Sequence, residues 1–369
     1  MKHINIDGAQ NVEVSRKLPS EKTPEEQLAL MERYTRVYRE NLSEDKAIRE
    51  VRCLSVIYPD LFRHLEPGDL TAGCLDFLPS GFGCVTSVGG VGHYCVFHKL
   101  RGLKNELPEE QWHRVDALYD FWQEHDLKTL YCQDVLDETV TGRFIDCAYP
   151  YMATARLSGM MLDYGKLMRL GVPGMKEEIR SHLVQDPDNA YLQASLEMMD
   201  LFEQVIHAQQ QLVTESREVP ESAKARMIQD LAAIEQAAPA TFRQALQLFW
   251  LYALCAGCIN YGRLDIVLGP YLKADIDAGI ETEKSAQEVL ESLWMLIENR
   301  RTTVNGRIIV GGRGRPDPEA ADLFAKICLR VVKKLRCVEP QFTFRVDSRT
   351  DPVPKDTAYG CTAAGATHP

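Results

Sequence analysis

Apolar residues recur with helical spacing through most of the first 300 residues. Thr23, Pro24 and Glu26 form a capping-box pattern with proline in the first turn. Apolar positions three and four residues apart follow, so the first helix has one hydrophobic face. A second helix is predicted to begin at residues 43–45 and to reach about Ile57. The pattern therefore predicts a helical N-terminal part.

Glycines cluster between residues 64 and 103 and interrupt this periodicity, which predicts a long structured loop. The helix predicted from Pro239 to Ala256 is apolar on most faces, which is typical of a helix at the centre of a fold. Helices are predicted over 109–125, over 151–170 with an end at Gly171, after the cap at 186–189, after Pro220, over 239–256 and over 285–301.

Strand patterns appear only near the end of the chain. Short runs at Arg307–Gly311 and Gln341–Val346 are typical of strands, and a helix is predicted between them from Asp317 to about Leu335. Strand, helix and strand at this spacing predict a parallel βαβ unit. No low-complexity linker separates the helical part from this unit, so we expect one α/β fold.

Composition and charge narrow the function. The 369 residues carry a net charge of -11, which disfavours nucleic acid or an anionic membrane as the main partner. The longest apolar run, Leu246 to Ile259, is too short to span a bilayer. The first residues lack an apolar signal region, so we expect a cytoplasmic protein whose eleven cysteines are reduced thiols.

Five segments in series resemble the glycyl radical enzymes, the family of pyruvate formate-lyase, glycerol dehydratase and choline trimethylamine-lyase. The segments are PATFRQALQLFW at 239–250, YGRLD at 261–265, NGRIIVGG at 305–312, EPQFTFR at 339–345 and GATHP at 365–369. The resemblance covers most of the chain.

The resemblance implies a ten-stranded α/β barrel built from two half-barrels of parallel strands. We expect residues 1–300 to be helical and residues 301–369 to begin the barrel, as the N-terminal part of a pyruvate formate-lyase type domain. The last residues resemble the approach to the active-site loop. We therefore expect a fragment whose catalytic cysteine and radical glycine lie beyond Pro369. Cys361 does not fit that cysteine, because the family has glutamate two residues later and this chain has Ala363.

The resemblance also implies the chemistry. Members abstract a hydrogen from an unactivated carbon with a thiyl radical, and a backbone glycine stores the spin. A separate activase that uses S-adenosylmethionine and an iron–sulfur cluster installs the glycyl radical. We therefore expect no cofactor or metal bound by these residues. The expected reaction of the complete enzyme is a lyase or dehydratase step on a small polar metabolite, with formate C-acetyltransferase activity as a further candidate. Expected partners are the activase, a C-terminal half or a second copy of the chain.

Four residues are candidates for substrate contact: His93, Cys258, Asp265 and Arg345. His93 lies in the glycine-rich segment and could donate a hydrogen bond or act as an acid or base; the alternative is a local loop contact. Asp265 could orient a hydroxyl or ammonium group, but an ion pair with Arg263 is the favoured interpretation. Arg345 shares a strand face with Gln341 and Thr343 and could bind a carboxylate.

Cys258 forms a Cys-x-x-Cys spacing with Cys255, which suits metal or redox chemistry, although two packed core thiols are favoured. Resembling diol dehydratases have a His-Ser pair where this chain has Gly257 and Cys258, which argues against a glycerol- or propanediol-type pocket. The glycine- and arginine-rich segment 311–315 lacks phosphate-loop spacing and is predicted to be a barrel loop with exposed arginines.

Two alternatives to a simple enzyme fragment stay open at this point. One is a non-catalytic truncated paralogue that acts as a helical binding or regulatory partner. The other is a split enzyme completed by a second polypeptide.

Overall fold

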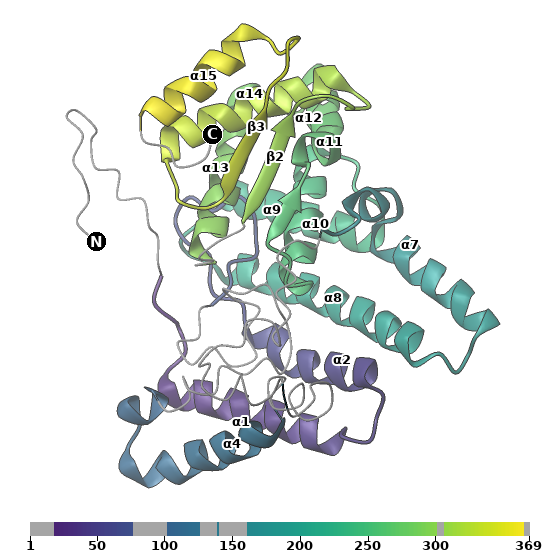
Figure 1. Cartoon of the computed structure of the whole chain (residues 1–369), viewed down its shortest axis with the longest axis vertical. Helices are drawn as coiled ribbons and strands as arrows, with labels where there is room; N and C mark the ends of the chain where they lie inside the picture. Colours follow the sequence, from purple (N-terminus) through teal and green to yellow (C-terminus); the bar gives the residue numbers. More distant parts are fainter. Residues whose placement is uncertain (1–17, 77–101, 126–138, 140–160, 301–305, 365–369) are drawn as a thin grey trace.

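The computed structural model describes residues 18–76, 102–125, 139, 161–300 and 306–364. Figure 1 shows a small sheet with its helices at one end of the long axis and helices α1 and α4 at the other. The described part is mostly helical with one parallel sheet, which confirms the α/β class.

The N-terminal helices follow their sequence signals. The Thr23 side chain accepts a hydrogen bond from the Glu26 amide at 3.2 Å, and the Glu26 carboxylate accepts one from the Thr23 amide at 2.7 Å. The predicted capping box is therefore confirmed. The indole of Trp122 donates to the Thr35 hydroxyl at 2.8 Å, which joins the last to the first of these helices. The elements are α1 (Pro24–Glu40), α2 (Lys46–Ile57), α4 (Trp112–His125) and the short 3₁₀ turns η1 (Tyr58–Asp60), η2 (Lys104–Glu106) and η3 (Glu109–Gln111).

The central helices are α7 (Tyr164–Gln185), α8 (Ala190–Glu215), α9 (Glu221–Gln236) and α10 (Phe242–Cys255). Helix α10 is buried along almost its whole length, as its apolar pattern predicted. Two of its buried side chains bond the chain segment around Ala72 and Gly73, which precedes α4. The Trp250 indole donates to the Gly73 carbonyl at 2.8 Å, and the Gln247 amide forms two 2.9 Å bonds with the Ala72 backbone.

The prediction of a helix from 151 to 170 needs correction. Residues 151–160 lie outside the described residues, and 161–163 are not helical. Gly171 does break the helix, with a φ of 60° that favours glycine. A side chain at this position would also come within 2.7 Å of the Ala238 backbone. The chain then resumes a helix with Pro173 near its start and continues to Gln185. The sequence pattern missed this second half.

The C-terminal part contains the sheet. Strands β2 and β3 run parallel with β2 in the middle, which confirms the predicted βαβ unit around α14. The elements are β1 (Asn260–Gly262), α11 (Leu264–Val267), α12 (Gly269–Asp277), α13 (Glu283–Asn299), β2 (Arg307–Gly311), α14 (Pro318–Leu335), β3 (Gln341–Arg345) and α15 (Pro352–Ala363).

Strand β1 corrects the expectation that residues 1–300 are helical. It pairs in parallel with β2, so the sheet begins at Asn260. Its three residues are too few to show alternation, and Gly262 has a φ of 66° in an irregular part of the register. The helices α11 and α12 that follow were also not predicted as separate elements.

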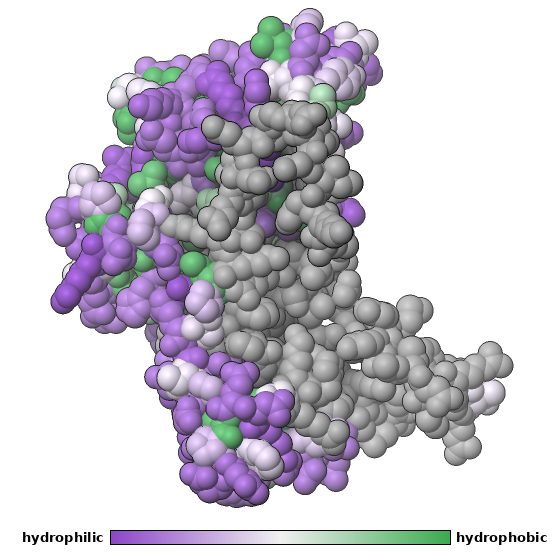
Figure 2. Space-filling model, turned by 90° about the vertical axis from the view of Figure 1, so that its left-hand side faces the viewer, coloured by the Kyte–Doolittle hydropathy of each residue, from purple (hydrophilic) through white to green (hydrophobic). Residues whose placement is uncertain are grey.

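One contiguous hydrophobic core runs from Leu28 in α1 to Cys361 in α15, so the helical and α/β parts share their packing. The seven cysteines that the described residues contain are all buried free thiols, as expected. Among the described helices, none combines the length and hydrophobicity needed to cross a bilayer. Figure 2 draws one side of the molecule. The described part of that side is mostly hydrophilic, with hydrophobic side chains scattered between polar ones.

Candidate functional site

The two faces of the sheet differ in polarity. One face carries Ile308, Val310 and Phe342, which are buried against α13 and α14. The ring of Phe342 lies 6.1 Å from that of Trp294 in α13. Alternation and register place seven residues on the opposite face: Asn260, Arg307, Ile309, Gly311, Gln341, Thr343 and Arg345. We call this second surface the open face, because its arginines and threonine are exposed.

Asp265 lies at the carboxyl end of the sheet and is fully buried. Its two oxygens accept hydrogen bonds from the Arg263 guanidinium, both at 2.9 Å, and one of them also accepts the Gly311 amide at 2.8 Å. Arg263 in turn donates to the Gly311 carbonyl at 2.9 Å. The ion pair favoured from the sequence is confirmed, and it ties the start of α11 to the end of β2. A substrate role for Asp265 stays a prediction that this geometry does not support.

Arg345 ends β3 on the open face and is exposed. Its side chain lies across the loop after β2, since a side chain added to Gly312 would come within 3.0 Å of the Arg345 Cβ and 3.3 Å of its Nε. Gly311 and Gly312 both have a φ of 77°. Two glycines in this conformation therefore let Arg345 pack closely on the loop.

Cys258 lies just before β1, with an exposed fraction of 2%. Its thiol donates to the Asn260 carbonyl at 3.3 Å, and its own carbonyl accepts the Arg300 guanidinium at 2.7 Å. Arg300 also donates to the Tyr261 hydroxyl at 2.9 Å, and burial raises the pKa of that tyrosine. Cys258 is thus a packed thiol within a hydrogen-bonded turn.

Cys255 does not join Cys258 in one site. It lines a separate pocket between helices, and burial raises the pKa of its thiol. No cluster of histidine, cysteine or carboxylate side chains suited to a metal occurs among the described residues. The favoured interpretation of two core thiols agrees with this arrangement.

A buried acidic pair at the amino end of the sheet was not found from the sequence. Glu339 precedes β3, and its amide donates to the Glu298 carboxylate at 2.8 Å. Its own carboxylate accepts the Gln341 amide at 3.2 Å. Burial, with a contribution from Glu298, raises the pKa of Glu339 from 4.5 to about 7. Glu298 and Glu339 lie far apart in the sequence, so no sequence motif indicated that they meet.

Cys337 and Glu339 share the Cys-x-Glu spacing that the resemblance attaches to the catalytic cysteine. The structure places this pair at the amino end of β3, and the Cys337 thiol contacts the Met295 sulfur of α13 at 4.0 Å. Burial raises the pKa of Cys337 to about 12. The thiol therefore belongs to the helical side of the sheet. Cys361 is likewise buried, against the Leu329 carbonyl of α14.

Two of the sequence expectations concern residues that the structure does not describe. His93 lies outside the described residues, and so does the segment 365–369 that ends at Pro369. The resemblance of this segment to the approach of an active-site loop is therefore not tested by the geometry. The location of the catalytic cysteine and the radical glycine beyond Pro369 likewise stays a prediction.

The arginines of the 311–315 loop are engaged in ion pairs. Arg313 pairs with Asp347 at 2.8 Å, and Arg315 pairs with Asp322. The prediction of exposed arginines holds for Arg313, but the Arg315 side chain is only 14% exposed because it lies against Asp322 of α14.

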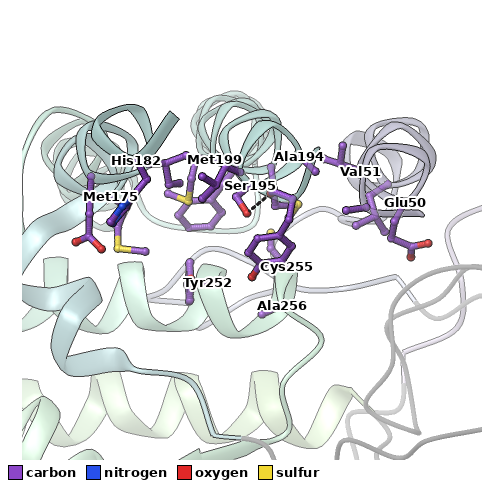
Figure 3. Close-up of a pocket in the computed structure, with 18 of the residues that line it drawn as sticks. Glu50, Val51, Met175, His182, Ala194, Ser195, Met199, Tyr252, Cys255 and Ala256 are labelled. Atoms are coloured by element: carbon purple, nitrogen blue, oxygen red, sulfur yellow. Dashed lines mark hydrogen bonds between the residues drawn. The ribbon is translucent and has the colours of Figure 1, made fainter. Parts of the chain in front are cut away.

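A pocket of about 570 Å³ lies between α2, α7, α8 and α10, away from the sheet (Figure 3). Its wall is largely apolar, with Val51, Met199 and Phe202 among the lining residues. Lys166 and Glu178 at this pocket pair with each other. Polar side chains such as Glu50, His182 and Tyr252 also line this pocket. We place the candidate site on the open face of the sheet, because parallel α/β sheets bind ligands at the carboxyl ends of their strands.

Comparisons with known proteins agree with this fold. Two curated relatives are the trans-4-hydroxy-L-proline dehydratase of Clostridioides difficile, 24% identical over 133 residues, and the (2S)-3-sulfopropanediol dehydratase of Klebsiella oxytoca, 25% identical over 254 residues. These matches cover 30% and 60% of this chain, but only 17% and 30% of the relatives.

Solved structures match nearly the whole chain. The glycerol-bound B12-independent glycerol dehydratase from Clostridium butyricum superposes with a TM-score of 0.73 at 15% identity, over 92% of this chain and 47% of that one. A glycyl radical enzyme from Archaeoglobus fulgidus gives 0.70 at 16% identity, over 94% of this chain and 51% of that one. At these identities the likeness establishes the fold, and this chain spans about half the length of those structures.

A family model described as pyruvate formate lyase-like matches residues 7–369. That match covers almost every residue of the chain, including the segments on which the resemblance rested. The chain therefore belongs to the pyruvate formate lyase-like family of glycyl radical enzymes.

Proposed function

We propose that this chain is the N-terminal part of a glycyl radical dehydratase that removes water from a small hydroxylated metabolite. The observation that carries the proposal is the parallel sheet with one polar, exposed face, in a fold shared with dehydratases along nearly the whole chain. In parallel α/β folds, ligands bind at the carboxyl ends of the strands, where this face meets the β2–α14 loop.

The relatives favour dehydration over the formate C-acetyltransferase reaction. Both curated relatives are named as dehydratases, and their names give hydroxyproline and sulfopropanediol as substrates. The glycerol dehydratase structure holds glycerol. Gly257 and Cys258 replace the His-Ser pair of resembling diol dehydratases, so we propose a substrate other than glycerol or propanediol.

Within the proposed site, the residues have different roles. Arg345 faces the substrate from β3, and His93 stays a predicted hydrogen-bond donor or acid. Cys258 and Asp265 hold the strands in place through the contacts described above. The open face thus binds and orients, and it contains no group that abstracts hydrogen.

The radical centres are proposed to lie beyond Pro369, outside these 369 residues. In the complete enzyme, the glycyl radical supplies hydrogen abstraction from an unactivated carbon after a separate activase has installed it. The residues described here would enclose the substrate and exclude water. A C-terminal half or a second copy of the chain is the proposed structural partner.

The test is anaerobic expression of the protein from its complete natural reading frame together with its activase. We expect a glycine-centred doublet in electron paramagnetic resonance and release of a dehydrated product from a small hydroxylated metabolite. The 369 residues expressed alone serve as the control and should give no doublet after the same treatment. A doublet from the control would contradict the proposed location of the radical.

A further inference from the structure

Two exposed arginines lie on the open face without an ion pair. Arg307 begins β2 and Arg345 ends β3, and within the described part of the chain neither guanidinium makes a hydrogen bond or salt bridge. None of the seven residues of the open face is acidic. This surface is positive in a chain whose net charge is -11. An arginine stays charged at any physiological pH, so the positive charge is permanent.

Acidic residues close to Arg345 in the fold have other partners. Asp347 follows two residues later and accepts the Arg313 guanidinium at 2.8 Å. Asp265, which contacts the end of β2 beside Arg345, is held by Arg263. Among the described residues, no acidic side chain therefore pairs with the guanidinium of Arg345, which is exposed.

Arg345 and Arg307 lie at different ends of the sheet. Register pairs Arg345 with Gly311 at the carboxyl end of the sheet and pairs Arg307 with Gln341 at the amino end. Four residues of strand separate the two ends, or roughly 13 Å at about 3.3 Å per residue. The two arginines therefore lie at opposite ends of the open face. Arg345 is at the end where parallel α/β sheets bind ligands, and Arg307 is not.

Thr343, the neighbour of Arg345 on the same face of β3, offers a second contact for a bound molecule. Thr343 is exposed two residues earlier, roughly 7 Å away along the strand. A molecule of three or four carbons could place an anionic group on Arg345 and a hydroxyl group on Thr343. The close packing of Arg345 on Gly312 restricts its side chain and lowers the entropy that such binding costs.

From these contacts we infer that the substrate is a small hydroxylated carboxylate or sulfonate whose anionic group is bound by Arg345. This inference rests on the proposed function and adds the substrate class. A carboxylate and a sulfonate each present oxygens to the two parallel N–H donors of a guanidinium. A neutral diol of the same size lacks that interaction.

The experiment measures binding to the complete protein without its activase, so that no turnover occurs. Isothermal titration compares three ligands with one carbon skeleton: glycerate, 2,3-dihydroxypropane-1-sulfonate and glycerol. We expect at least one of the anions to bind about tenfold or more tightly than glycerol. Arg345→Gln should weaken anion binding by about 10- to 100-fold and change glycerol binding less than about twofold. Comparing the two anions decides between carboxylate and sulfonate.

Arg307→Gln is the matched control, because it removes the same group from the same face at the far end. It should change anion binding less than about twofold, and Arg345→Lys should recover part of the affinity. The melting temperatures of these variants should equal that of the wild type, since neither arginine has a described partner to lose. Preferential binding of glycerol, or equal losses in the two glutamine variants, would overturn the inference. Glycerol binding with a normal radical signal would leave the proposed dehydratase function standing.

Discussion

The two faces of the small sheet use alternate residues of the same strands for different purposes. Ile308, Val310 and Phe342 are buried on the face toward α13 and α14, whereas Thr343 and Arg345 are exposed on the other. In Figure 1, α14 lies behind β2 and β3. The comparison shows that one face contributes to the core of the α/β part and that the other leaves its threonine and arginines exposed.

The two ends of the sheet differ in how they accommodate buried carboxylates. At the carboxyl end, Asp265 has a bidentate arginine partner and a backbone amide. At the amino end, Glu339 lies beside a second carboxylate, that of Glu298, and its pKa is raised to about 7. A buried carboxylate is thus either neutralised by a cation or favours its protonated form.

The largest expected effect concerns the buried face. Phe342→Ala removes a ring that is 1% exposed and packs near Trp294, so it should lower the free energy of unfolding by about 3–5 kcal/mol. Thr343→Ala, one residue along the strand, should change it by less than about 0.5 kcal/mol. Urea unfolding of both variants measures the difference. Equal losses would show that the open face is also packed.

The next effect concerns the carboxyl end. Asp265→Asn removes the charge that holds Arg263 and should destabilise the protein by about 2–4 kcal/mol, because a buried pair loses one ion. Asp347→Asn provides the comparison at a surface ion pair, since its partner Arg313 is 63% exposed, and should cost clearly less stability than Asp265→Asn. Thermal unfolding of the two variants measures how their losses of stability compare. If both cost the same, the ion pair of Asp265 does not hold the sheet.

The smallest effect concerns the amino end and depends on pH. Because the pKa of Glu339 is higher in the folded than in the unfolded chain, its contribution to stability is fully present below about pH 4.5 and is lost as the pH rises through about 7. Glu339→Gln should therefore stabilise the protein at pH 8 by about 1–3 kcal/mol and weaken the pH dependence between these values.

Chemical unfolding at pH 5 and pH 8 measures this prediction. Glu177→Gln in α7, with a side chain 79% exposed, controls for the general loss of one negative charge. A wild-type protein that is as stable relative to Glu339→Gln at pH 8 as at pH 5 would refute the raised pKa.

Sequence periodicity was sufficient for elements of ordinary length. The capping box at Thr23, the buried helix around Trp250 and the two longer strands were all confirmed. It failed at Gly171, where the chain resumes a helix after a break, and at the three-residue strand β1. A helix that resumes directly after a glycine break, and a strand of three residues, leave no periodic signal.

Candidate residues could be named from the sequence, but only the fold sorted them. The ion pair between Arg263 and Asp265 was foreseen because the two residues are close in the chain. The surroundings of Cys258, which include Arg300, and the meeting of Glu339 with Glu298 were not foreseen. Such partners lie about 40 residues apart, and their proximity depends on how β1, α13 and β3 pack.

The sequence by itself determined the helical segments, the alternation along β2 and β3 and the membership of a radical enzyme family, because periodicity and ordered motifs are properties of the chain. Only the tertiary structure decided which polar side chains are consumed by the fold and which stay free. Asp265 and Arg345 were both named as candidates from the sequence, with an ion pair favoured for Asp265, and the structure shows the first fully buried in that pair and the second exposed beside Gly312. The reason is that burial and pairing depend on distant segments meeting in space.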